Sequence, residues 1–137
     1  MPRSLVDTCA IIAFIDRNER WHAQVKEAFS AARLPLVTTQ AVLTETFYFA
    51  QQIRGTEAIW SMVLNGSIAV APIEQTELRA LHTLMTRYAD RPMDFADATL
   101  VHVAARENIS AILTIDHDDF ETYRFGRNRK FRILPGR

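Results

Sequence analysis

Short apolar runs alternate with longer segments in which apolar residues recur every three or four positions. The short runs are typical of buried strands, and they cover residues 4–6, 35–39, 68–70, 111–115 and 131–134. The longer segments predict helices over residues 10–15, 20–32, 40–53, 56–64, 74–88 and 94–107. Strands that alternate with helices indicate an α/β fold, in which helices flank both faces of a central, mostly parallel sheet.

The composition fits one domain over residues 1–137, because 137 residues with 48% hydrophobic content can bury one core but not two. Only four glycines are present, and no low-complexity run marks a linker. The first apolar stretch is interrupted by Asp7, so it is too short and too charged for a membrane span or a secretory signal. Cys9 is the only cysteine, which excludes an internal disulfide. We therefore expect a cytoplasmic protein that does not associate with membranes.

The net charge is zero, but its distribution is uneven. Residues 124–137 carry a local charge of +6 and no acid, from Arg124, Arg127, Arg129, Lys130, Arg132 and Arg137. The rest of the chain therefore carries −6, because the total is zero. Two interpretations remain open for the basic segment. It could bind a polyanion, or its charges could protect an edge strand from pairing with other chains.

Two acids follow predicted strands directly: Asp7 after residues 4–6 and Asp116 after residues 111–115. Ligands of open parallel sheets bind at this end of the strands. Each acid also has a simpler explanation, since Asp7 could cap the next helix and Asp116 could belong to an ordinary acidic turn. Thr114, two residues before Asp116, could hydrogen-bond a carboxylate or merely fill the strand.

Glu45 lies in the predicted helix 40–53 with Tyr48 and Phe49 one turn away. We expect it to be at least partly buried, and no lysine or arginine stands one turn away to pair with it. A buried carboxylate usually pairs with a cation or a metal. Asp94 and Asp97 open the helix 94–107, where Asp94 suits the N-cap and Asp97 the reciprocal position of a capping box. We interpret Asp94 as a cap that supports the site and Asp97 as a ligand.

If these acids converge, they need a cation, because packed carboxylates repel one another and hold their protons. A set of oxygen ligands selects a hard ion, Mg²⁺ with Mn²⁺ as a substitute, over zinc. Such an ion can clamp a phosphate and activate water, which predicts phosphodiester hydrolysis. The chain has no P-loop, dinucleotide fingerprint or serine nucleophile elbow. A phosphatase with a nucleophilic aspartate is disfavoured, because position 9 is cysteine where that chemistry needs a second aspartate.

Four motifs, in this order, resemble those of PIN-domain proteins, especially VapC-type toxins of bacterial toxin–antitoxin pairs. The matching stretches are Leu-Val-Asp-Thr (5–8), Thr-x-x-Val-x-x-Glu (39–45), Met-Asp-x-x-Asp-Ala-x-Leu-Val (93–101) and Leu-Thr-x-Asp-x-x-Asp-Phe (113–120). The resemblance implies a three-layer α/β/α domain and a Mg²⁺-dependent endoribonuclease. By matching, the acidic site falls on Asp7, Glu45, Asp97 and Asp116, with Thr8, Asp94 and Thr114 as supporting residues. It also implies a homodimer and inhibition by a cognate antitoxin.

An acidic site that takes RNA needs basic groups nearby, since phosphates would otherwise be repelled. The candidates for RNA binding are Arg17, Arg20, Arg127, Arg129 and Lys130, with Arg54 as a further one. The alternative is a PIN-like module that binds RNA or a partner protein without hydrolysis.

Overall fold

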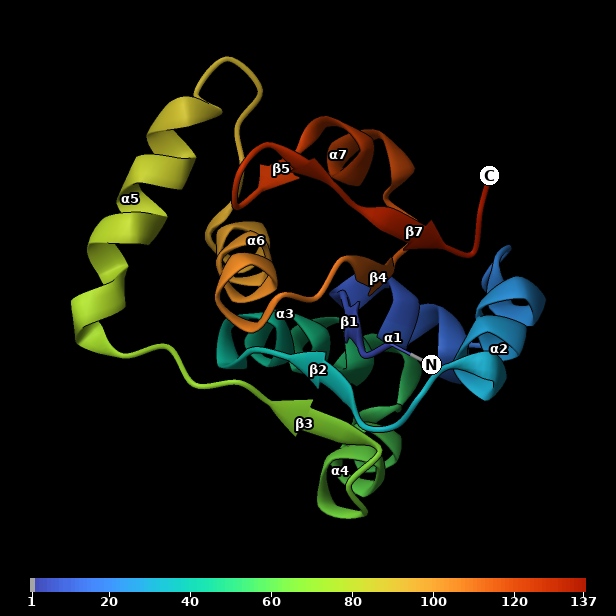
Figure 1. The fold of residues 1–137 in the computed structure, drawn as a ribbon. Coiled ribbons are helices and arrows are strands. Elements are labelled where there is room, and N and C mark those ends of the chain that lie inside the picture. Colours follow the sequence, from blue (N-terminus) through green and yellow to red (C-terminus); the bar gives the residue numbers. More distant parts are fainter. Residues whose placement is uncertain (1) are drawn as a thin grey trace.

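A computed structural model describes residues 2–137, and it contains a five-stranded parallel sheet flanked by helices (Figure 1). The strands of this sheet are β1 (Ser4–Val6), β2 (Leu36–Thr38), β3 (Ile68–Val70), β4 (Ala111–Leu113) and β7 (Arg132–Leu134). Their order is β3-β2-β1-β4-β7, and every neighbouring pair is parallel. The predicted three-layer α/β/α architecture is confirmed.

The helices follow the predicted segments closely, with small shifts at their ends. They are α1 (Thr8–Ile15), α2 (His22–Ala31), α3 (Gln40–Ala50), α4 (Thr56–Leu64), α5 (Leu78–Arg87), α6 (Phe95–Glu107) and α7 (His117–Thr122). Two short 3₁₀ turns extend them, η1 (Gln51–Ile53) after α3 and η2 (Gln75–Glu77) before α5. No helix among residues 2–137 has the length and apolar character needed to cross a membrane.

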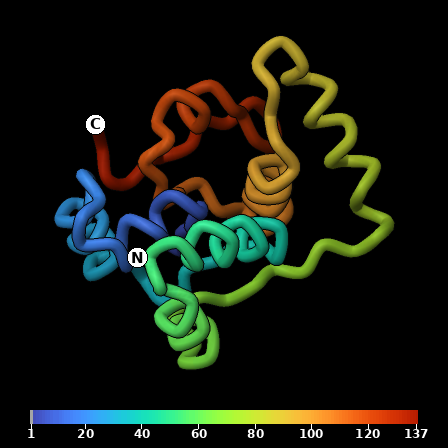
Figure 2. Tube along the Cα trace, turned by 180° about the vertical axis from the view of Figure 1, so that it is seen from behind, coloured from blue at the N-terminus to red at the C-terminus, as the bar shows by residue number. Residues whose placement is uncertain are grey.

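The middle of the sheet is the most deeply buried part of the fold, since every residue of β1, β2 and β4 is buried. This burial explains why these strands read as continuous apolar runs rather than as alternating ones. In Figure 1, α5 stands apart from the sheet, and it packs against α6. The view from behind shows α3 and α4 in front (Figure 2). Helix α6 packs against both α3 and α5, so it joins the outlying helix to the rest of the fold.

Three local expectations were wrong or incomplete. The predicted strand 111–115 ends at Leu113, because the hydroxyl of Thr114 accepts a hydrogen bond from the backbone N–H of Asp116 and turns the chain. Helix α7 and the small hairpin of β5 (Arg124–Phe125) and β6 (Arg129–Lys130) were not predicted. They are too short to show a clear hydrophobic period. The predicted last strand begins at Arg132 rather than at Phe131.

Candidate active site

The acids Asp7 and Asp116 lie beside each other because they follow neighbouring parallel strands. Val6 of β1 pairs with Leu113 of β4, and the backbone N–H of Asp7 donates to Leu113 O at 3.0 Å. Thr114 joins the two acids, since its hydroxyl donates to Asp7 Oδ2 at 3.1 Å and accepts from the Asp116 N–H at 3.0 Å. The sheet thus sets the position of Asp7, and the turn after β4 sets that of Asp116.

Asp7 has a second task as the N-cap of α1, where its Oδ1 accepts from the Thr8 N–H at 2.8 Å. Its side chain is nevertheless nearly inaccessible, with 5% of the residue exposed. Burial raises the pKa of Asp7 to about 6, although the hydrogen bonds from Thr8, Cys9 and Thr114 act in the opposite direction. The cap and the candidate ligand are therefore one residue, and the two interpretations of Asp7 do not exclude each other.

Asp97 lies on the first turn of α6 and is 7% exposed. Burial and the nearby charge of Asp7 raise its pKa to about 8. The N-cap is Asp94, as predicted, and its Oδ1 accepts from the Asp97 N–H at 2.7 Å. The capping-box alternative for Asp97 is not seen among the described residues, where the hydrogen bond to its carboxylate comes from the Tyr123 hydroxyl, which donates to Oδ2 at 3.0 Å. Tyr123 is itself fully buried.

The sequence interpretation missed Asp119 as a member of the site. Ligand atoms of Asp97, Asp116 and Asp119 all lie within 4.8 Å of one another, which is close enough to share an ion. Asp116 is the N-cap of α7, and its Oδ1 accepts from the Asp119 N–H at 3.4 Å. Burial and the contact with Asp119 raise the pKa of Asp116 to about 6. The spacing of three residues between these acids was the available signal, since it puts them on one face of a helix start.

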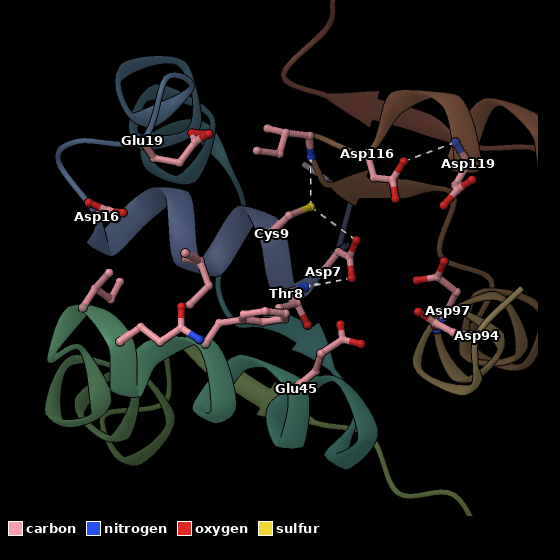
Figure 3. A pocket seen from close by; sticks show the side chains of 15 residues that line it. Asp7, Thr8, Cys9, Asp16, Glu19, Glu45, Asp94, Asp97, Asp116 and Asp119 are labelled. Carbon is pink, nitrogen blue, oxygen red and sulfur yellow. Dashed lines mark hydrogen bonds between the residues drawn. The ribbon is translucent and has the colours of Figure 1, made fainter.

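Glu45 reaches the same site from α3, on the opposite side from Asp116 (Figure 3). It is half-buried, as expected. Among its apolar neighbours one turn away, Val42 is fully buried, whereas Tyr48 and Phe49 are 63% and 43% exposed. Glu45 and Phe49 line the same cavity, and the charge of Glu45 contributes to the raised pKa of Asp7.

All four predicted acids and Asp119 line one open cavity of about 440 Å³. Thr8, Asp94 and Cys9 line it too. Thr114 is not part of the lining, but its hydroxyl donates to Asp7, which is. Its lining contains eight acids and no lysine or arginine: Asp7, Asp16, Glu19, Glu45, Asp94, Asp97, Asp116 and Asp119. Carboxylate oxygens at this density, with the pKa values of Asp7, Asp97 and Asp116 raised, fit a hard divalent cation.

The predicted RNA-binding residues do not line this cavity. Arg17, Arg20 and Arg54 are exposed at the ends of helices or in loops. Arg127, Arg129 and Lys130 belong to the exposed tip and second strand of the β5–β6 hairpin, where Arg129 lies 4.8 Å from the ring centroid of Phe125. Strand β7 is an edge strand, as one interpretation of the basic segment required. Polyanion binding by that segment stays a prediction.

Comparison with known proteins agrees with this geometry. The chain is 28% identical over 134 residues to Ribonuclease VapC26 of Mycobacterium tuberculosis, covering 96% of this chain and 99% of that protein. Its fold is similar to the crystal structure of VapC20 of Mycobacterium tuberculosis, described as a sarcin–ricin-loop-cleaving toxin. That match has a TM-score of 0.76 at 20% identity and covers 83% of this chain and 90% of the other. Residues 4–126 match the PIN domain family, and the chain belongs to that family.

Proposed function

We propose that the chain is a metal-dependent endoribonuclease and the toxin of a type II toxin–antitoxin pair. The observation that carries the proposal is the cavity itself, where buried and half-buried carboxylates from four parts of the fold meet without a lysine or arginine in the lining. Similarity to Ribonuclease VapC26 and to the VapC20 toxin supports RNA as the substrate. The whole chain, residues 1–137, acts as one PIN domain in this proposal.

Asp7, Glu45, Asp97 and Asp116 would hold Mg²⁺, with Mn²⁺ as a substitute. Asp119 could join them, because its ligand atom lies within 4.8 Å of those of Asp97 and Asp116. When bound, such an ion supplies a Lewis acid that polarises the phosphate and makes water a better nucleophile. The surrounding residues of the chain orient the ligands. Thr8 and Thr114 fix both oxygens of Asp7. Asp94 fixes the start of α6 and thereby the backbone of Asp97.

Glu45 differs from the other acids because it comes from α3 rather than from the sheet edge or α6. A chain of hydroxyl contacts ties this helix to the site. Thr8 Oγ1 donates to Val42 O at 3.2 Å, and Thr39 Oγ1 and Thr99 Oγ1 lie 2.7 Å apart between α3 and α6. These contacts hold α3 at a fixed distance from Asp7 and Asp97, so Glu45 can complete a ligand set without a large movement.

The proposal includes a cytoplasmic location, a homodimer and a cognate antitoxin that covers the acidic cavity. A free ribonuclease in the cytoplasm would harm its own cell, and the cavity is open to solvent at its mouth. A partner that inserted a cationic side chain there would neutralise the same charges as the metal does.

A cleavage assay tests the proposal. Purified protein is incubated with total RNA in Mg²⁺, in Mn²⁺ and in EDTA, beside an Asp7→Asn variant whose fold is checked by circular dichroism. We expect discrete RNA fragments with either metal, and no fragments with EDTA or from the folded variant. Expression of the wild-type protein, but not of the variant, should stop growth. Metal-independent RNA binding with no cleavage in any condition would instead identify a binding module.

A further inference from the structure

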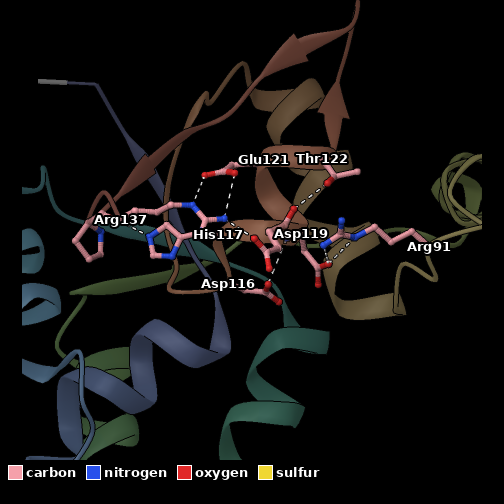
Figure 4. A network of polar contacts seen from close by, with 9 residues as sticks. Arg91, Asp116, His117, Asp119, Glu121, Thr122 and Arg137 are labelled. Carbon is pink, nitrogen blue, oxygen red and sulfur yellow. Dashed lines mark hydrogen bonds and ion pairs between the residues drawn. The ribbon is translucent and has the colours of Figure 1, made fainter.

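The loop between α5 and α6 brings one cation to an acid of the cavity. Arg91 Nε and Nη2 both donate to Asp119 Oδ1, at 3.1 and 3.0 Å (Figure 4). The Arg91 side chain is 46% exposed and is not part of the cavity lining, so it reaches Asp119, which does line the cavity, from outside. Asp119 in turn lies next to Asp97 and Asp116, with ligand atoms within 4.8 Å.

The backbone around Arg91 is anchored on both sides. Its N–H donates to Tyr88 O at 3.1 Å, and the ring of Tyr88 packs edge-on against that of Tyr123. The next residue is Pro92, which restricts Arg91 to extended backbone conformations. Met93 then returns to the core, with 3% of its surface exposed. The guanidinium therefore projects from a fixed point instead of from a free loop.

The pairing with Asp119 leaves part of the guanidinium available. An arginine has five N–H donors, of which Asp119 takes one from Nε and one from Nη2. Within residues 2–137, Nη1 of Arg91 has no hydrogen-bond partner. Two other arginines near acids differ in this respect. Arg106 Nη1 donates to Glu77 and to Pro72 O, and Arg137 bonds both Asp118 and Glu121.

Nη1 of Arg91 lies next to an acidic cavity, where a bound polyanion needs a cation. RNA entering a cavity lined by eight acids is repelled wherever its phosphates are not neutralised. A metal ion offsets the charge at the reacting phosphate only. A planar guanidinium whose orientation is already fixed by a carboxylate loses little further entropy when it binds a phosphate oxygen.

We propose that Arg91, oriented by Asp119, binds a backbone phosphate of the RNA adjacent to the one that is cleaved. This inference rests on the proposed ribonuclease function. Arg91 acts as a positioning residue for the substrate, and it was not among the basic residues predicted from the sequence. The hairpin residues Arg127, Arg129 and Lys130 lie outside the cavity lining, so any RNA contact they make is farther from the cleaved bond.

Binding of a labelled single-stranded RNA of randomised sequence tests the inference. It is measured in Mg²⁺ over a range of KCl concentrations, with Asp7→Asn as the background so that the probe stays intact. Adding Arg91→Gln should weaken binding about tenfold at low salt, because a charge-assisted contact to phosphate is lost. It should also reduce the slope of log affinity against log salt by about 0.7, the value for one contact to a single strand.

Two variants separate this role from a structural one. Arg91→Gln keeps a donor for Asp119, whereas Arg91→Lys keeps the charge and should restore most of the salt slope. Arg87→Ala is the matched control, because Arg87 is exposed at the end of α5 and does not line the cavity. It should change neither affinity nor slope.

Cleavage by the wild-type protein, measured in parallel, distinguishes the possible failures. If the wild-type protein cleaves RNA but Arg91→Gln binds the probe with unchanged affinity and slope, the assignment of Arg91 is wrong and the ribonuclease function stands. Tighter binding by Arg91→Gln would likewise overturn the assignment, since Arg91 would then obstruct the site. Absence of both cleavage and probe binding would overturn the ribonuclease function and the role of Arg91 together.

Discussion

Acidic side chains in two regions of this protein have opposite surroundings. Glu77, at the end of η2, accepts a hydrogen bond from the Glu74 N–H at 2.8 Å. It also contacts His102 Nε2 at 2.7 Å and accepts from Arg106 Nη1 at 2.6 Å. The backbone bond first, and then His102 and Arg106, lower its pKa to about 2. Glu77 thus has partners within the fold, and it connects η2 to α6.

Asp7 and Asp97 in the cavity are buried more deeply than Glu77, and no lysine or arginine is among the causes of their pKa shifts. The pKa of Asp7 is raised to about 6 and that of Asp97 to about 8, in both cases mainly by burial. Glu77 has an arginine beside it, whereas the donors to Asp7 and Asp97 are neutral backbone, thiol and hydroxyl groups. Burying Asp7 and Asp97 without a cation lowers the stability of the fold, which is typical of carboxylates that bind a cation from outside the chain.

Replacement of Asp97 by asparagine should have the largest effect. Loss of a candidate ligand should lower RNA cleavage by more than about 100-fold, since even supporting residues of metal sites contribute 10- to 100-fold. The metal-free variant should be as stable as the wild type or more so at neutral pH, because Asp97 must take up a proton when the chain folds, whereas asparagine is neutral in both states. The amide oxygen can still accept from Tyr123. Gel-based cleavage and thermal unfolding check both parts. Undiminished cleavage would remove Asp97 from the site.

The second prediction concerns pH. Asp7 and Asp97 have folded-state pKa values of about 6 and about 8, above their ordinary value of 3.8. Between pH 4 and pH 8 the unfolded chain releases protons that the native protein keeps, so metal-free stability should fall as pH rises. Asp7 alone corresponds to about 3 kcal/mol at most. Urea unfolding at several pH values, with and without Mg²⁺, measures this trend, and Mg²⁺ should reduce it.

Glu77 sets the opposite trend in a different range of pH. Because its pKa is lowered to about 2, the stability it contributes is present above its ordinary value of 4.5 and is lost as pH falls toward 2. Metal-free stability should therefore pass through a maximum at mildly acidic pH. A stability that rises steadily up to pH 8 without metal would contradict the contrast between the two regions.

A third and smaller effect is expected from Tyr123→Phe. The ring would keep its packing against Phe120 and Tyr88, while Asp97 would lose the hydroxyl that orients its Oδ2. Metal affinity should fall about tenfold, with little change in circular dichroism. Mn²⁺ titration followed by electron paramagnetic resonance measures the affinity. Tyr88→Phe is the control, since the Tyr88 hydroxyl accepts from the Arg124 N–H and does not contact an acid of the cavity.

Glu77→Gln should give the smallest effect on catalysis and complete the comparison. It removes the charge that Arg106 and His102 contact, so the melting temperature should decrease. RNA cleavage and metal affinity should stay at the wild-type level, because Glu77 does not line the cavity. A large loss of cleavage at unchanged melting temperature would show that the two regions are coupled.

The sequence was sufficient for the sheet and for four of the cavity acids, for a physical reason. Buried parallel strands are short and continuously apolar, so β1 and β4 were visible, and the acids Asp7 and Asp116 after them were easy to locate. Glu45 and Asp97 lie on long helices, α3 and α6, whose segments were predicted from the sequence. The motif order then matched the PIN family, which the comparison over residues 4–126 bears out.

Contacts between distant parts of the chain were not visible in the sequence. Asp119 and Arg91 are 28 residues apart, and their pairing depends on how the α5–α6 loop folds back on α7. Tyr123 follows a helix too short to show a period, so its hydrogen bond to Asp97 could not be predicted. The sequence also did not show which apolar neighbours of Glu45 lie at the surface, since Tyr48 and Phe49 are exposed while Val42 is buried.

The central claim is that the cavity carboxylates hold protons that a divalent cation displaces. Calorimetric titration of Mg²⁺ at pH 7, repeated in buffers with different ionisation enthalpies, counts the protons released on binding. We predict net release, mainly from Asp97 with its pKa of about 8, and the same release from Glu77→Gln. Asp97→Asn should release fewer protons and bind more weakly. Mg²⁺ binding without proton release, or equal release from Asp97→Asn, would show that Mg²⁺ does not displace protons from these carboxylates.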